Sequence, residues 1–131
     1  MSDKLLTADD LALINEPHLG YVATVMADGS PQITPVWVDT DGENVRFNTA
    51  RGRVKTRNLE RDPRIAVLVV DEKDFYRWVE VRGTAELIDE GADEHIDALA
   101  KKYLGADTYP FRQPDEKRVT VKVNAQHRIS P

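Results

Sequence analysis

The residues of this sequence that could do chemistry gather in one basic stretch. Between positions 51 and 64 there are six cationic side chains and two acidic ones, although the whole chain has a formal net charge of -5. The six cations are Arg51, Arg53, Lys55, Arg57, Arg61 and Arg64. Such an excess of positive charge in an acidic protein indicates either a site for an anion or a solvated basic helix.

The basic stretch is expected to begin a short helix. A strand ends near Thr49, a turn follows around Gly52, and the helix should stop before Pro63. A helix N-terminus carries unpaired N–H groups and the positive end of the helix dipole, so acidic residues usually occupy it. Here the cations Arg53 and Lys55 occupy it instead. A bound phosphate would relieve the repulsion between these cations and the positive end of the helix dipole. The Thr49 hydroxyl would add a donor.

Length and composition indicate an ordinary globular protein. The 131 residues, of which 40% are hydrophobic and 31% charged, suit a single domain spanning 1–131. No apolar run approaches the ~20 residues of a membrane span, and the N-terminus shows no signal peptide. There are no cysteines, which excludes disulfides and fits a cytoplasmic protein. The acidic balance argues against nucleic-acid binding.

Six segments have strand patterns and are separated by turn signals. They are Gly20–Met26, Pro31–Val38, Val45–Thr49, Ile65–Val70, Tyr76–Leu87 and Val119–Val123. The unbroken apolar run Ile65–Val70 predicts burial on both faces. Pro35 lacks an N–H donor, so its strand should lie at a sheet edge or where something else packs. Gly83 indicates a bulge or a close approach of the backbone.

Helical patterns occupy the rest of the chain. Thr7 should cap a helix that ends near Pro17, and Asp93–Leu104 has apolar residues at helical spacing before a capping Gly105. Residues 108–116 should form an irregular loop. About six strands with three peripheral helices predict a mainly β fold, an antiparallel barrel or sandwich.

Common catalytic patterns are missing from the sequence. His18, His95 and His127 are far apart and are interpreted as surface or capping residues, so no metal site is expected. No serine sits in a triad context, and no phosphate-loop or dinucleotide fingerprint occurs. Glu80 and Arg82 share a strand face, where they could pair with each other or with a partner. An enzyme with this sequence would need a cofactor for its chemistry, and otherwise the protein is a binding module.

Several motifs in order resemble the pyridoxamine-5′-phosphate-oxidase-like flavin/deazaflavin superfamily. They are Ala23-Thr24-Val25, Asp28-Gly29-Ser30-Pro31, Thr34-Pro35-Val36-Trp37, Phe47-Asn48-Thr49, Lys55-Thr56-Arg57-Asn58-Leu59, Asp62-Pro63 and Arg77-Trp78-Val79-Glu80-Val81-Arg82-Gly83. Each motif alone is weak, but the ordered set is specific. The match is nearest to the branch of reductases that use the deazaflavin coenzyme F420.

The resemblance implies a split β-barrel of the FMN-binding type that forms a homodimer, with a cofactor site in each groove between subunits. By position, Thr49, Arg53 and Lys55 would hold the coenzyme phosphate, and Pro35, Val36 and Trp37 would line the deazaflavin ring. Arg51 and Arg57 would attract its acidic tail. Trp78 and Arg82 would approach from the other subunit. The loops over residues 71–75 and 108–116 would largely shape the pocket.

The resemblance also implies an oxidoreductase that transfers a hydride between F420 and a small unsaturated organic substrate. No catalytic side chain is assigned. One alternative is an FMN-binding enzyme of the same fold, although the chain lacks the C-terminal extension with Arg, Trp and His that the true oxidases carry. Another is a non-catalytic carrier or haem-binding protein, for which His127 is the candidate axial ligand.

Overall fold

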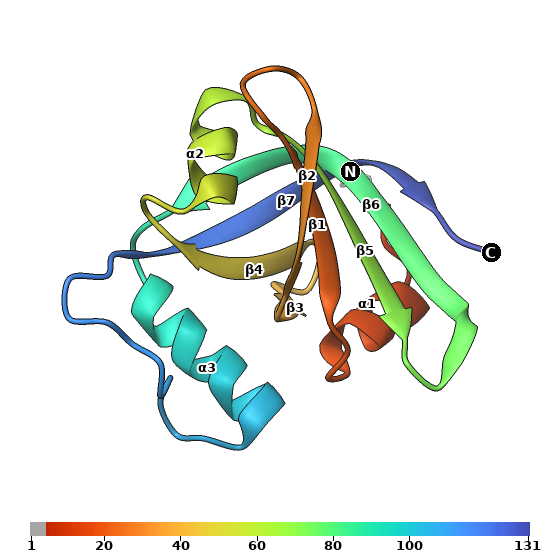
Figure 1. Cartoon of the computed structure of the whole chain (residues 1–131). Helices are drawn as coiled ribbons and strands as arrows, with labels where there is room; N and C mark the ends of the chain where they lie inside the picture. The colour runs from red at the N-terminus through yellow and green to blue at the C-terminus, as the bar shows by residue number, and fades with distance from the viewer. Residues whose placement is uncertain (1–4) are drawn as a thin grey trace.

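The structure, a computed structural model, describes residues 5–131 as a strongly curled antiparallel sheet with three helices (Figure 1). The N-terminal segment inspected for a signal peptide lies mostly outside this range. The strands are β1 (Gly20–Val25), β2 (Pro31–Val36), β3 (Val38–Thr40), β4 (Val45–Ala50), β5 (Arg64–Asp71), β6 (Asp74–Ile88) and β7 (Arg118–Ile129). The helices are α1 (Ala8–Asn15), α2 (Val54–Arg61) and α3 (Ala92–Leu104).

The seven described strands form one sheet in the order β2-β1-β5-β6-β7-β4-β3. Every neighbouring pair is antiparallel. The predicted mainly β architecture with peripheral helices is therefore confirmed. The count of about six strands is one short, because the segment expected as a single strand from Pro31 to Val38 is two strands.

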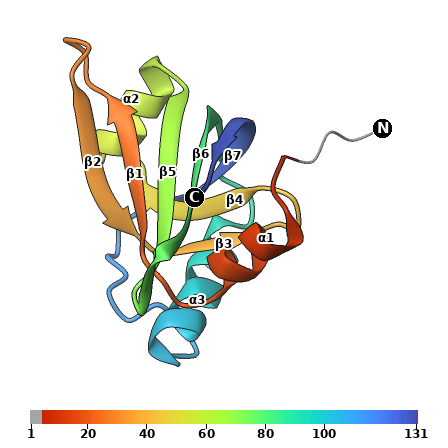
Figure 2. The same ribbon diagram turned by 90° about the vertical axis from the view of Figure 1, so that its right-hand side faces the viewer.

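The break at Trp37 explains how the sheet curls. Residues before Trp37 pair with β1 at one edge of the sheet, and residues after it pair with β4 at the other edge. The chain thus crosses between the two edges within one residue, and Figure 2 shows β3 following the lower end of β2, above α3. Pro35 lies on the edge strand β2, which confirms one of its two predicted explanations.

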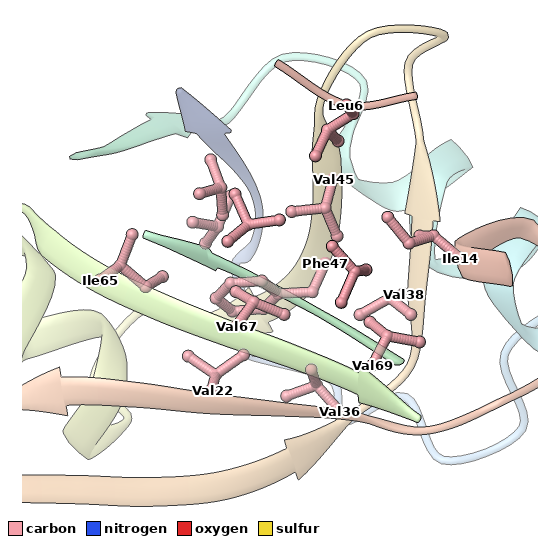
Figure 3. Close-up of a cluster of buried hydrophobic side chains, with 14 of the residues drawn as sticks. Leu6, Ile14, Val22, Val36, Val38, Val45, Phe47, Ile65, Val67 and Val69 are labelled. Atoms are coloured by element: carbon pink, nitrogen blue, oxygen red, sulfur yellow. The ribbon is translucent and has the colours of Figure 1, made fainter. Parts of the chain in front are cut away.

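The core fills the inside of this curled sheet (Figure 3). Alternate side chains of the strands meet there around Phe47, which is fully buried, and α1 adds Ile14 from one end. The prediction that Ile65–Val70 is buried on both faces is wrong. Ile65, Val67 and Val69 are buried, whereas the intervening residues remain half-exposed because they face outward.

The ends of the elements follow the local sequence. Thr7 caps α1 in a capping box with Asp10. Gly105 ends α3 at φ +71°. The expected bulge at Gly83 is present, since the register of β6 against β7 shifts between Arg82 and Gly83. Across residues 5–131, no helix is both long and apolar enough to traverse a membrane.

Candidate functional site

A cavity of about 340 Å³ opens where β4 ends and α2 begins. In Figure 1, α2 and α3 lie on the same side of the molecule with β4 between them. The lining residues are Leu19, Pro35, Val36, Trp37, Asn48, Thr49, Arg53, Lys55, Ile96, Leu99, Tyr109, Phe111 and Arg118. Six of the ten predicted site residues are therefore brought to one cavity: Pro35, Val36, Trp37, Thr49, Arg53 and Lys55.

The start of α2 has the geometry expected from the sequence. Gly52 adopts φ +90°, a left-handed conformation that glycine tolerates best. Arg53 occupies the N-cap position without a side-chain cap, and the first turn contains no acidic residue. The positive end of the helix dipole is therefore left without negative charge from its own first turn.

Lys55 is the least compensated cation of the cavity. Its side chain makes no hydrogen bond or ion pair with any residue in the 5–131 range. Burial, followed by the positive charges of Arg53 and Arg118, lowers the pKa of Lys55. The ammonium group is thus held in a positive field, and an anion in the cavity would stabilise it.

Thr49 contributes a hydroxyl group to the same wall. Its side chain is buried and lies 3.2 Å from the Thr56 hydroxyl, which also donates to Ala50 O at 2.8 Å. Because Thr56 has a single hydroxyl proton and Ala50 O can only accept, the Thr49 proton is available to Thr56 or to a ligand. Thr49 can therefore act as a donor in the cavity.

Arg118 is a further cation of the cavity, one that is buried and that the sequence analysis missed. Its Nε donates to Asn48 Oδ1 at 2.9 Å, and its Nη1 donates to Glu116 Oε1 at 2.8 Å. Glu116 also accepts from Arg53 at 3.2 Å, so one carboxylate joins the two guanidinium groups. Antiparallel pairing places Arg118 opposite Ala50 at the end of β4. A link of this kind across the sheet leaves no local signal in the sequence.

Aromatic side chains form the opposite wall. Trp37 contacts Tyr109 edge-on, with ring centroids 6.0 Å apart, and Tyr109 contacts Phe111 in the same manner at 5.7 Å. Both Tyr109 and Phe111 come from the loop expected over residues 108–116. That loop was predicted to shape the site, and it does line the cavity. The other loop named for this role, 71–75, lines a separate hollow.

His95 lies behind the cavity, and its interpretation as a surface or capping residue is wrong. It is 6% exposed, and its Nε2 lies 3.1 Å from Asp39 Oδ1. Its Nδ1 lies 3.2 Å from Asn48 Nδ2 and 2.9 Å from Thr120 Oγ1. The partners of Asn48 fix this geometry, because its Nδ2 donates to Ala92 O while its Oδ1 accepts from Arg118. His95 Nδ1 must then accept, which leaves Nε2 to donate to Asp39.

The remaining four predicted site residues lie outside this cavity. Arg51 is paired with Asp89 and Glu60, and Arg57 is exposed on α2. Trp78 borders a hollow beside α1. Arg82 lies 3.0 Å from Glu80, which is one of the two pairings that their shared strand face predicted. Within a single chain these four do not join the other six, and their roles stay predictions.

A family profile described as pyridoxamine 5′-phosphate oxidase matches residues 6–129. The chain belongs to that family. The fold of a solved relative confirms the split barrel predicted from the sequence. A solved structure named F420 reductase superimposes with a TM-score of 0.81 at 30% identity, covering 95% of this chain and 98% of that one.

Two further proteins are similar to this chain over most of its length. The F420H(2)-dependent biliverdin reductase of Mycobacterium tuberculosis (strain CDC 1551 / Oshkosh) is 29% identical over 124 residues, which is 92% of this chain and 85% of that protein. A conserved hypothetical protein from Mycobacterium tuberculosis has a TM-score of 0.74 at 26% identity, covering 98% of this chain and 86% of that one. The resemblance to the F420-dependent branch is thus confirmed.

Proposed function

We propose that this protein is an F420-dependent oxidoreductase that transfers a hydride between the deazaflavin coenzyme and a small unsaturated organic substrate. The relatives support F420-dependent oxidoreduction in general, since two of them carry F420 in their names. The proposal goes further by placing the coenzyme in the cavity between α2, α3 and β4 and by assigning residues to its parts.

One observation carries the proposal: Lys55 stands in a positive field without a carboxylate partner among the described residues. Arg53 and Thr49 lie on the same cavity wall, beside the uncapped start of α2. A phosphate oxygen there would receive charge-assisted hydrogen bonds from side chains and from backbone N–H groups. The coenzyme phosphate is the group that fits this wall.

The apolar half of the cavity suits a flat ring. Pro35 and Val36 form part of the lining, and Trp37 and Tyr109 add aromatic surface. Once bound, the deazaflavin would supply two-electron hydride chemistry. The protein's own contribution would be to orient the ring and to exclude water from the face that meets the substrate. No side chain is assigned as a proton donor.

The proposal includes a homodimer, as the resemblance implies. The outer face of the sheet carries exposed Tyr21 and Ile33 and the half-buried Leu68, a surface that a second copy could cover. In the dimer, Trp78 and Arg82 would approach the cavity of the partner subunit. Arg57 is exposed and free to contact the acidic tail of the coenzyme. Arg51 is already paired with Glu60 and Asp89, so it would first have to give up part of these ion pairs.

The test is a titration of the purified protein with F420 and with FMN. We expect F420 to bind more tightly than FMN. Tighter binding of FMN would contradict the proposal and identify FMN as the coenzyme. Lys55→Ala should weaken coenzyme binding about tenfold to a hundredfold, because it removes a charge-assisted contact. Lys73→Ala, on the exposed turn between β5 and β6, is the matched control and should bind as the wild type does.

Turnover decides between an enzyme and a carrier. Reduced F420 should be oxidised in the presence of at least one member of a panel of enones, quinones and tetrapyrroles. Binding of F420 without turnover across the panel would favour a carrier. An unchanged affinity in Lys55→Ala would remove Lys55 from the site.

A further inference from the structure

Arg118 is a buried guanidinium group whose hydrogen bonds leave one of its nitrogens unused. Its side chain is 4% exposed and lines the cavity. Asn48 accepts from Nε, and Glu116 accepts from Nη1. No hydrogen bond to a described residue engages Nη2, although this nitrogen carries two protons. Among the described residues, Thr34 Oγ1 is the one buried side-chain atom without a hydrogen-bond partner, so Nη2 is not sealed but open, and a ligand in the cavity could accept its hydrogen bonds.

The charges around Arg118 do not balance. Three cations line the cavity (Arg53, Lys55 and Arg118), and Glu116 is the carboxylate in contact with them. The cluster is therefore left with a formal excess of two positive charges. Water screens the half-exposed Arg53, but at the buried Arg118 the excess positive charge is unfavourable unless an anion offsets it.

The geometry around Arg118 is rigid. Its guanidinium lies over the Tyr109 ring, 5.1 Å from the centroid, which restrains the plane of the group. Asn48 is itself fixed by Ala92 O and by His95. A donor held from two sides and stacked on a ring is ready for a ligand before the ligand arrives.

We infer that Arg118 is a third anion-binding residue of this cavity, which donates through Nη2 to the phosphate of the bound ligand. Glu116 then acts as the bridge that holds Arg118 and Arg53 on either side of that phosphate. This inference rests on the proposed function for the identity of the coenzyme, but it concerns any phosphate-bearing ligand of the cavity. Nothing in the motifs that suggested Lys55 includes Arg118, because it enters from β7.

Inorganic phosphate, F420 and FMN are the probes, each titrated by NMR or calorimetry against the full chain. Arg118→Gln should weaken phosphate and coenzyme binding about tenfold or more, since it removes a charge-assisted donor. Arg77→Gln is the matched control, because Arg77 is also held by carboxylates but lies beside α1. It should bind phosphate as the wild type does.

The outcomes separate this inference from the proposed function. If the wild type binds phosphate but neither coenzyme, the proposed function fails, and the loss of phosphate binding in Arg118→Gln still supports the inference. Wild-type affinity for phosphate in Arg118→Gln overturns it. So does a wild type that binds no phosphate at all.

Folding of the variant is checked by circular dichroism. If Arg118→Gln does not fold, Arg118→Lys carries the test, because it keeps the buried positive charge. A lysine has no planar fork to serve Asn48, Glu116 and a ligand together, so phosphate should again bind about tenfold more weakly. Undiminished phosphate affinity in Arg118→Lys would overturn the inference.

Discussion

The ring of Trp37 stacks on the ring of Tyr103, with centroids 5.4 Å apart and planes 8° from parallel. Trp37 is the residue at which the chain crosses from one edge of the sheet to the other, and Tyr103 belongs to the last turn of α3. The Tyr103 hydroxyl accepts from Val38 N at 3.0 Å and donates to His18 O at 2.5 Å. Helix α3 therefore fixes the crossing and one wall of the cavity together.

Tyr103→Phe tests this link. The variant keeps the stacked ring but leaves Val38 N–H and His18 O without their partner, so it should lower the free energy of unfolding by about 1–3 kcal/mol. Urea denaturation measures the change. Tyr76→Phe, at a side chain that is 86% exposed, should stay within about 0.5 kcal/mol of the wild type. Equal effects of the two variants would show that the hydroxyl contacts contribute nothing.

Gly83→Ala tests the bulge in β6. A Cβ atom at this position would lie 1.9 Å from Asn124 O, a backbone atom that cannot rotate away. The variant should lose about 1–3 kcal/mol of stability through forced backbone shifts. Thr84→Ala on the same strand is the comparison and should cost no more than about 1 kcal/mol. A Gly83→Ala protein as stable as the wild type would mean that β7 can move freely.

His95→Leu tests the buried polar network behind the cavity. Asn48, Thr120 and Asp39 would each lose a partner, so the free energy of unfolding should fall by about 2–4 kcal/mol. Thermal and urea unfolding give the size of the loss. His127→Leu, at an exposed histidine, should change stability by less than about 0.5 kcal/mol. The two variants should therefore differ clearly in their loss of unfolding free energy. Similar losses would argue against the network.

The carboxyl group of Glu16 gives a prediction about pH. Hydrogen bonds from Arg77 and then from His18 lower the pKa of Glu16 from 4.5 to about 2. Because the folded pKa is depressed, the pairing stabilises the fold above about pH 4.5 and is lost as the pH falls toward 2. In Arg77→Gln, carbon-13 NMR of Glu16 should find a pKa closer to 4.5. A pKa that stays near 2 would assign the shift to His18.

Local sequence patterns predicted much of the fold because their causes are local. The short helix α2, its glycine turn and its cationic start follow from a few adjacent residues. The missing N–H of Pro35 predicted either a sheet edge or a place where something else packs, and Pro35 lies on an edge strand. The strand Pro31–Val38 was wrong because nothing within it marks Trp37 as a crossing between edges. That break depends on which strands β2 and β3 pair with.

The sequence by itself determined the basic start of α2, the apolar alternation of the strands and, through its ordered motifs, the family. Only the tertiary structure decided that Arg118 and Glu116 join Arg53 and Lys55, and that His95 is buried behind Asn48. The physical reason is distance along the chain. Arg118 reaches the start of α2 through the pairing of β4 with β7, and nothing in the sequence of either strand marks the other as its partner.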